Sequence, residues 1–156
     1  MKIIDQALLS ALTDEARTAP RRRKNHNLHP NDEFCCHRLF NAIEPGSYIR
    51  PHRHLHPDKD ETFVIVRGAL GVILFDDAGE IVSSTILTPG RPALAANIPS
   101  TLFHGAVSMA PGTVFFEAKA GPYLPLSPEE IASWAPVEGT PEAAAYLARL
   151  AARLLE

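Results

Sequence analysis

The chain has 156 residues, a net charge of −3 at pH 7, 46% hydrophobic and 21% charged residues, which is typical of one ordinary globular domain. A chain of this length can bury about 68–70% of its unfolded surface, so folding requires neither a disulfide nor a structural metal. The single basic run, residues 21–24, is too short to indicate a nucleic-acid interface and is interpreted as a solvated stretch. No apolar stretch approaches the ~20 residues of a membrane span.

The two cysteines, Cys35 and Cys36, are adjacent, and a disulfide between neighbours is strained. The N-terminal stretch MKIIDQALLS lacks the uninterrupted apolar segment of a secretory signal. We therefore expect a cytoplasmic protein with reduced thiols.

The first 32 residues are expected to form a helix and a lead-in segment. Apolar residues recur at helical spacing at Ile4, Leu8, Leu12 and Ala16, and Pro20 lies just beyond the expected end of the helix.

Residues 33–120 show a different pattern, with short apolar or alternating runs separated by turn signals. The runs are FCCHRLFNAI, ETFVIVRG, ALGVILFD, EIVSSTIL, ALAANIP, TLFHGAVSM and TVFFEAK. Several of the turns contain Pro-Gly pairs, as at residues 45–46, 89–90 and 111–112. Many short strands with no helices between them predict an all-β fold, a small antiparallel β-barrel or jelly roll.

Residues 121–156 are expected to form an irregular wrap followed by a C-terminal helix. Tyr123 and Trp134 are the candidates for pinning the wrap to the barrel surface. Thr140 is a good N-cap and Pro141 suits the first turn of the helix. An apolar stripe follows at Leu147, Leu150 and Leu154. This helix packs either on the barrel or on a second chain, and we expect a homodimer.

The stretch RPHRHLHPDKDET carries the strongest functional signal. His52, His54 and His56 occupy alternate positions, and alternate side chains of an extended segment share one face. Glu61 follows at the start of the next expected strand. Imidazoles and a carboxylate that converge in this way fit a divalent first-row metal, whereas the alternative is an exposed polar loop.

A later strand adds His104 within IPSTLFHG. The order of Gly46, His52-x-His54, Glu61 and Gly68, followed by a proline and His104, resembles the two motifs of the cupins. Six residues separate His54 from Glu61, a longer spacing than in the usual cupin motif.

The phrases RRRKNHNLH, LFNAIEPGSYIRPHRH, ETFVIVRGALGVILFDDAG and FFEAKAGPY, in this order, resemble the WbuC family of cupin-fold metalloproteins over residues 1–137. The resemblance implies a metal site of two histidines, a glutamate and a third histidine, which here are His52, His54, Glu61 and His104. It also implies a link to O-antigen gene clusters without a settled reaction.

Other polar residues are candidates for the surroundings of this site. His56 precedes Pro57 and is expected to be a loop residue at the barrel mouth. Asn27 and His29 either cover the mouth or cap turns, and Glu117 either accepts a hydrogen bond from a ligand imidazole or faces outward. These four are the predicted substrate-binding residues.

Three neutral imidazoles and one carboxylate suit zinc, iron, manganese or nickel, and leave positions open for water or a small molecule. Two functions therefore remain open. One is a metal-dependent enzyme acting on a small polar substrate, including a carbohydrate-derived one; the other is a non-catalytic binding or regulatory module.

Overall fold

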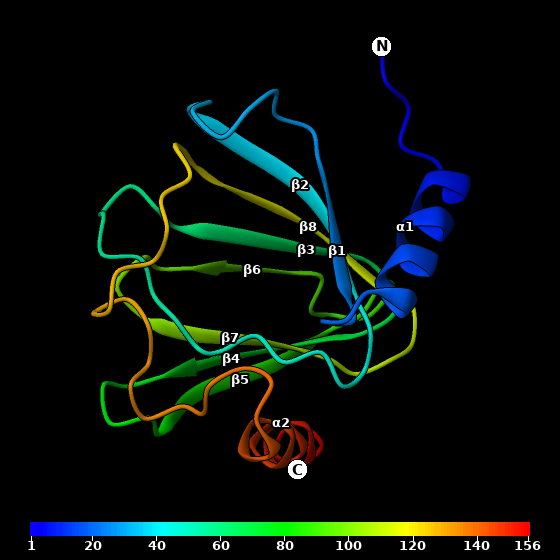
Figure 1. Cartoon of the computed structure of the whole chain (residues 1–156). Helices are drawn as coiled ribbons and strands as arrows, with labels where there is room; N and C mark the ends of the chain where they lie inside the picture. Colours follow the sequence, from blue (N-terminus) through cyan, green and yellow to red (C-terminus); the bar gives the residue numbers. More distant parts are fainter.

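The computed structural model describes residues 1–156, which form two facing antiparallel β-sheets and two helices (Figure 1). The helices are α1 (Gln6–Thr18) and α2 (Pro141–Arg153). The strands are β1 (Arg23–Asn27), β2 (Cys36–Ile43), β3 (Glu61–Arg67), β4 (Leu70–Phe75), β5 (Ile81–Leu87), β6 (Ala95–Ile98), β7 (Phe103–Ser108) and β8 (Thr113–Ala120).

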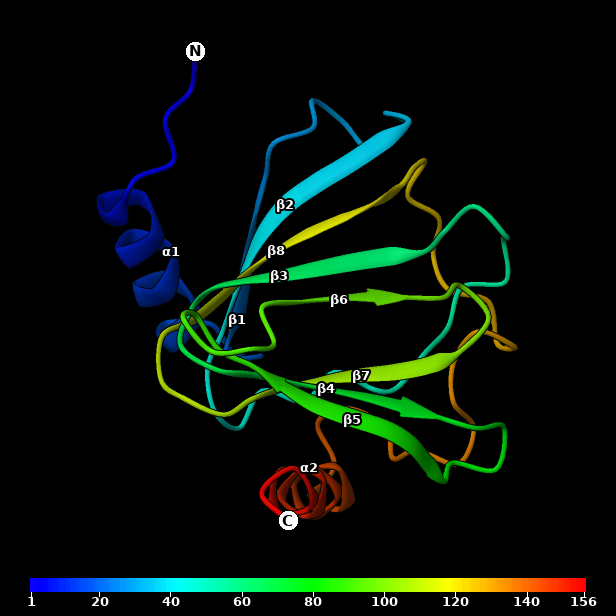
Figure 2. The ribbon, with the colours of Figure 1, turned by 180° about the vertical axis from the view of Figure 1, so that it is seen from behind.

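The larger sheet has the strand order β1-β2-β8-β3-β6 and the smaller has the order β5-β4-β7. All pairs within both sheets are antiparallel. Seen from behind, the two sheets diverge from one end of the molecule to the other (Figure 2). The expected jelly-roll class is confirmed, although the sheets form a sandwich rather than a closed barrel.

Each of the seven predicted apolar runs contains a strand, but β1 was not predicted. Its sequence, RKNHN, has no apolar residue, so the alternation that identifies a strand is absent. It nevertheless pairs with β2 along its whole length, from Arg23 opposite Ile43 to Asn27 opposite Leu39. The lead-in segment therefore contributes an edge strand to the larger sheet.

The main core lies between the sheets and joins apolar side chains from their facing surfaces. Its buried members are Ile43, Phe63, Ile65, Leu70, Val72, Leu87, Ile98, Ala106 and Phe115. Gly68 makes the turn between β3 and β4 with a φ of 76°, and a Cβ there would lie 2.7 Å from the Cα of Thr113. Only glycine suits this position, because the conformation is left-handed and the neighbouring backbone is close.

Helix α1 covers the outer face of the larger sheet, as its amphipathic pattern predicts. Leu9, Leu12 and Ala16 pack on Ala42 of β2 and Val114 of β8. The Asp5 side chain caps the helix by accepting a hydrogen bond from the amide of Leu8.

Helix α2 packs on the outer face of the smaller sheet of its own chain through Ala143, Leu147 and Leu150. Trp134 holds the preceding wrap in place by packing against Phe75 and Phe103. The prediction that Tyr123 also pins this wrap is wrong. Its side chain is 58% exposed, because only its backbone amide is held, by the carbonyl of Asp32. Neither helix has the length and apolar character needed to cross a membrane.

Candidate metal centre

Backbone hydrogen bonds bring the histidine-rich segment between β2 and β3 to the free edge of β7. The amide of His52 donates to the carbonyl of His104 (3.1 Å), and the amide of His104 donates to the carbonyl of His52 (2.8 Å). The amide of His54 donates to the carbonyl of Ser100 (2.8 Å). These hydrogen bonds hold together two segments that are far apart in the sequence. The imidazoles of the two segments therefore lie close to one another.

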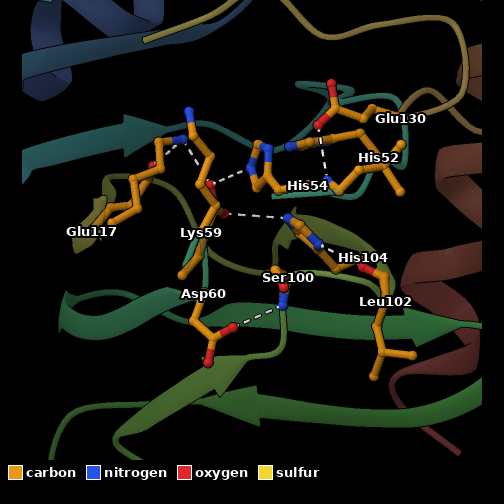
Figure 3. A network of polar contacts seen from close by, with 12 residues as sticks. His52, His54, Lys59, Asp60, Ser100, Leu102, His104, Glu117 and Glu130 are labelled. Atoms are coloured by element: carbon orange, nitrogen blue, oxygen red, sulfur yellow. Dashed lines mark hydrogen bonds and ion pairs between the residues drawn. The ribbon is translucent and has the colours of Figure 1, made fainter. Parts of the chain in front are cut away.

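The facing sheet supplies a carboxylate at the same point. Glu61, the first residue of β3, is 2% exposed and pairs with Lys119 of β8. Each of His52, His54, Glu61 and His104 offers one ligand atom, and these atoms all lie within 4.8 Å of one another. The structure thus brings together the four residues that the sequence analysis selected. Figure 3 shows the polar contacts around His54 and His104.

Backbone carbonyls fix two of the imidazoles. Nδ1 of His52 lies 3.1 Å from the carbonyl oxygen of Arg50, and Nδ1 of His104 lies 3.1 Å from that of Leu102. A carbonyl accepts only, so Nδ1 carries the proton in both rings and Nε2 keeps its lone pair. Metal-binding histidines are commonly oriented by such a hydrogen bond on their other nitrogen.

The remaining contacts of the cluster are made by Glu61. Nε2 of His54 lies 2.8 Å from Oε1 of Glu61, and Nε2 of His104 lies 3.3 Å from Oε2. Burial alone would raise the pKa of Glu61, but the close contacts with His104 and His54 and the charge of Lys119 outweigh it and hold the pKa well below its ordinary value. Glu61 is therefore a carboxylate at neutral pH.

The residues fit a divalent cation. Nε2 of His104 is buried without a hydrogen-bond partner, although it points into the cluster. An orphaned buried nitrogen of this kind is costly unless something binds it. Burial, and then the neighbouring His104, lower the pKa of His52 to about 3, so its imidazole is neutral and able to donate a lone pair. Three neutral imidazoles and a carboxylate are a donor set that zinc, iron, manganese and nickel accept.

Lys119 is a further member of the site that the sequence analysis did not select. Its ammonium bridges two carboxylates, Oε1 of Glu61 at 2.7 Å and Oε1 of Glu117 at 2.8 Å. Burial alone would lower the pKa of Lys119, but Glu117 and Glu61 outweigh it and raise the pKa above its ordinary value. The alternation Phe115, Glu117, Lys119 along β8 was the available signal, because it puts both charged residues on the core-facing side.

Glu117 does not contact a ligand imidazole, which was one of the two roles expected for it. It is 8% exposed, and its partners are Lys119 and the Nδ2 group of Asn41, which donates to Oε2 at 2.7 Å. Glu117 is therefore linked to the cluster through Lys119, which also contacts Glu61.

The other predicted residues, His56, Asn27 and His29, lie outside the four-residue cluster. His56 is exposed in the loop before β3, and its Nδ1 accepts a hydrogen bond from the amide of Asp58. Asn27 and His29 line a second hollow together with His37 and Lys119. The rings of His29 and His37 stack at 4.0 Å, and both are buried. None of these side chains belongs to the four-residue cluster.

A cavity of about 220 Å³ lies between the sheets, beside the cluster. His52, Glu61 and His104 line it, and so do Glu117 and Lys119. A small molecule in this cavity would therefore contact both the candidate metal ligands and the buried charged pair.

Comparisons with known proteins agree with this architecture. A family model described as a domain of unknown function (DUF6016) matches residues 4–87, more than half of the chain. No curated protein matches the chain.

Similar solved structures include KdgF from Halomonas sp., with 20% identity over 69% of this chain and 85% of that one and a TM-score of 0.51. TT1209 from Thermus thermophilus has 20% identity over 77% of this chain and 97% of that one, with a TM-score of 0.54. An RmlC-like cupin protein from Desulfovibrio desulfuricans has 14% identity over 76% and 97% of the two chains, with a TM-score of 0.50. At these identities the likeness establishes a cupin-like fold and nothing about activity.

Proposed function

Because this chain belongs to a family whose shared domain has no known function (DUF6016), we propose its function from its site: it binds one divalent transition-metal ion through His52, His54, Glu61 and His104. The observation that carries the proposal is the orphaned Nε2 of His104, buried and directed into a cluster of three other ligand atoms. The ion is zinc, iron, manganese or nickel.

We further propose that the site acts on a small polar molecule. A divalent ion supplies Lewis-acid polarisation of a bound oxygen. Glu61 then serves as a ligand and is not available as a base. Of the predicted substrate-binding residues that could transfer a proton, His56 lies in an exposed loop and His29 lies in the neighbouring hollow, so the nearer proton-transfer group is Glu117.

The alternative is a binding or regulatory protein without turnover. One observation favours it: Glu117 already accepts hydrogen bonds from both Lys119 and Asn41, so this carboxylate is engaged and is not a free base. Such a network suits the recognition of a ligand at least as well as proton transfer.

We also propose that the chain is of the WbuC type, since the phrases that resemble that family include all the candidate ligands except His104. We also propose a cytoplasmic location, which the two free cysteines support because they suit a reducing compartment.

The test is metal content of purified variants. We expect His104→Gln, which retains a polar side chain of similar size, to lower metal content from about one ion per chain to a small fraction. His56→Ala is the matched control and should retain the metal, because its side chain lies outside the cluster. Circular dichroism checks that both variants are folded. Full occupancy in His104→Gln would remove this residue from the site.

A further inference from the structure

The cavity beside the cluster has two unlike walls. Apolar side chains form one part of its lining, namely Ile43, Ile49, Phe63, Ala106 and Phe115. Polar side chains from neighbouring strands of the larger sheet form the other part, namely Asn25, Asn41, Glu117 and Lys119. In Figure 3, Glu117 lies on one side of the polar network and His52, His54 and His104 lie on the other. The unpredicted strand β1 contributes Asn25, directly opposite Asn41 of β2.

The polar wall presents hydrogen-bond acceptors to the cavity. Nδ2 of Asn41 faces Oε2 of Glu117, and a carboxylate can only accept, so the amide orientation of Asn41 is fixed and its Oδ1 remains as an acceptor. Each oxygen of Glu117 receives one hydrogen bond, from Asn41 or from Lys119, and has capacity for another. A molecule that satisfies these acceptors must donate hydrogen bonds, as a hydroxyl or an ammonium group does.

Charge decides between these two donors. The ammonium of Lys119 is balanced by Glu117, whereas a divalent ion would be balanced only by Glu61, since imidazoles bind a metal in their neutral form. The loaded site would thus carry one excess positive charge. This excess opposes an ammonium group and favours a ligand with one negative charge.

Basic residues also line this cavity, and most of their charge is paired with carboxylates. Arg23 forms a two-pronged ion pair with Glu138, at 2.6 and 3.0 Å. Lys24 pairs with Glu15 at 3.2 Å. Arg21 also lines the cavity and lies 3.8 Å from the same Glu138, so the two arginines share one carboxylate and keep one positive charge in excess. This excess adds to the preference for an anionic ligand.

The anionic group and the hydroxyl must lie close together in the ligand. One ammonium, that of Lys119, bridges Glu61 of the cluster and Glu117 of the acceptor wall, so the two carboxylates are separated by only two hydrogen bonds. The cavity volume of about 220 Å³ is also below the ~300–1,000 Å³ typical of pockets for drug-sized ligands. Both limits indicate a compact molecule rather than one with a nucleotide attached.

We infer that the cavity binds a small hydroxycarboxylate, whose carboxylate lies at the cluster and whose hydroxyl donates to the acceptor pair formed by Glu117 and Asn41. The inference rests on the proposed metal function and names the class of ligand that this site takes. Asn41 and Glu117 are then residues that select for the hydroxyl group.

The experiment is calorimetric titration of the metal-loaded full-length chain with matched acids. The probes are glycolate, both lactates, glycerate and gluconate, each paired with the acid of the same carbon count that lacks hydroxyls, and sorbitol as a neutral polyol. We expect at least one hydroxy acid to bind about tenfold or more tightly than its deoxy partner, the size of effect of one hydrogen bond to a charged group. Sorbitol should bind more weakly than gluconate.

Asn41→Leu tests the wall itself, since leucine has a similar size and no amide. We expect the preference for the hydroxyl to fall below about threefold while the metal content stays at one ion per chain. Asn97→Leu is the matched control, because Asn97 lies exposed on the same sheet and contacts Thr62. The Asn97→Leu variant should keep the wild-type preference for hydroxy acids over their deoxy partners.

Two negative outcomes are distinguishable. If the chain binds one metal ion but prefers no hydroxy acid over its deoxy partner, or if Asn41→Leu keeps the full preference, the ligand inference is overturned and the metal function stands. If the chain binds no metal, the proposed function fails, and the charge argument for an anionic ligand fails with it.

Discussion

Lys119 is the residue whose surroundings most affect the candidate metal centre. Its ammonium donates to Oε1 of Glu61, which leaves Oε2 as the oxygen nearest the orphaned nitrogen of His104. Lys119 therefore acts as a positioning residue that presents one oxygen of the carboxylate to the cluster. Groups that orient metal ligands in this way typically contribute a factor of about 10–100 in affinity.

Replacement of Lys119 by methionine tests this role. We expect the dissociation constant for the metal to rise about tenfold or more, because Glu61 loses the donor that fixes its orientation and Glu117 loses its counter-charge. Competition with a chromophoric chelator measures the constant, and the d–d spectrum of the cobalt-loaded protein reports whether the coordination changes. Lys24→Met is the control, since Lys24 contacts Glu15 on the surface. Equal affinity in the wild type and Lys119→Met would rule out the positioning role.

At the scale of elements, one ion pair joins two parts of the chain that no sequence pattern connects. Arg23 of β1 holds Glu138, which lies just before α2, and also donates to the carbonyl of Tyr48 (3.0 Å). Arg23 thereby connects the edge strand β1 with two other segments, the one before the histidine run and the one before α2. The hydrogen bond from Arg23 lowers the pKa of Glu138 below its ordinary value of 4.5.

This pair gives a pH-dependent contribution to stability. Since the folded state lowers the pKa of Glu138, the contribution is complete above pH 4.5 and is lost as the pH falls through the lowered value. We expect Glu138→Gln to reduce the free energy of unfolding by about 0.5–1 kcal/mol at pH 7, as for other partly exposed ion pairs. The difference from the wild type should shrink below pH 4.5. Urea unfolding at several pH values measures the difference in free energy of unfolding between the wild type and Glu138→Gln. A difference that stays constant down to about pH 3 would contradict a stabilising role of the Glu138 carboxylate.

At the scale of the whole molecule, the cluster joins two sheets that share no strand pairing. Glu61 belongs to the larger sheet and His104 to the smaller one, whereas His52 and His54 come from the segment between β2 and β3, which is hydrogen-bonded to the edge of β7. A bound ion would therefore act as a tie across the sandwich as well as a functional group.

Removal of the metal should destabilise the entire fold. At a free metal concentration about a hundred times the dissociation constant, binding adds about 2.7 kcal/mol to the free energy of unfolding. For a chain of this length that corresponds to a rise of about 5–10 °C in melting temperature. Scanning calorimetry with and without chelator measures the shift. His104→Gln should show no shift, and a full shift in this variant would place the ion elsewhere.

The predicted homodimer also belongs to this scale. Helix α2 is used within its own chain, so it no longer motivates the dimer. Val64, Val82 and Leu94 remain exposed on or beside strands of the two sheets and offer apolar area for a second copy. We expect light scattering at micromolar concentration to give twice the 17.0 kDa of one chain. A mass of one chain would show that these residues stay exposed.

The sequence by itself determined the elements whose residues alternate or recur regularly. Helix α1, helix α2 and seven of the strands were evident, because burial of one face imposes a period that local sequence carries. The cluster of His52, His54, Glu61 and His104 was also predicted, because the resemblance to the cupin motifs implies these four residues. The spacing of the histidines alone left an exposed polar loop as the alternative.

The tertiary structure alone decided what depends on contacts between distant strands. Strand β1 has no apolar pattern and exists because β2 offers it an edge. The contacts of Lys119 could not be predicted from the sequence either. It contacts Glu117 of its own strand, β8, and also Glu61 of β3, which lies 58 residues earlier in the chain. Local sequence records which side of its own strand a residue occupies, whereas its neighbours across the sheet are set by register and packing.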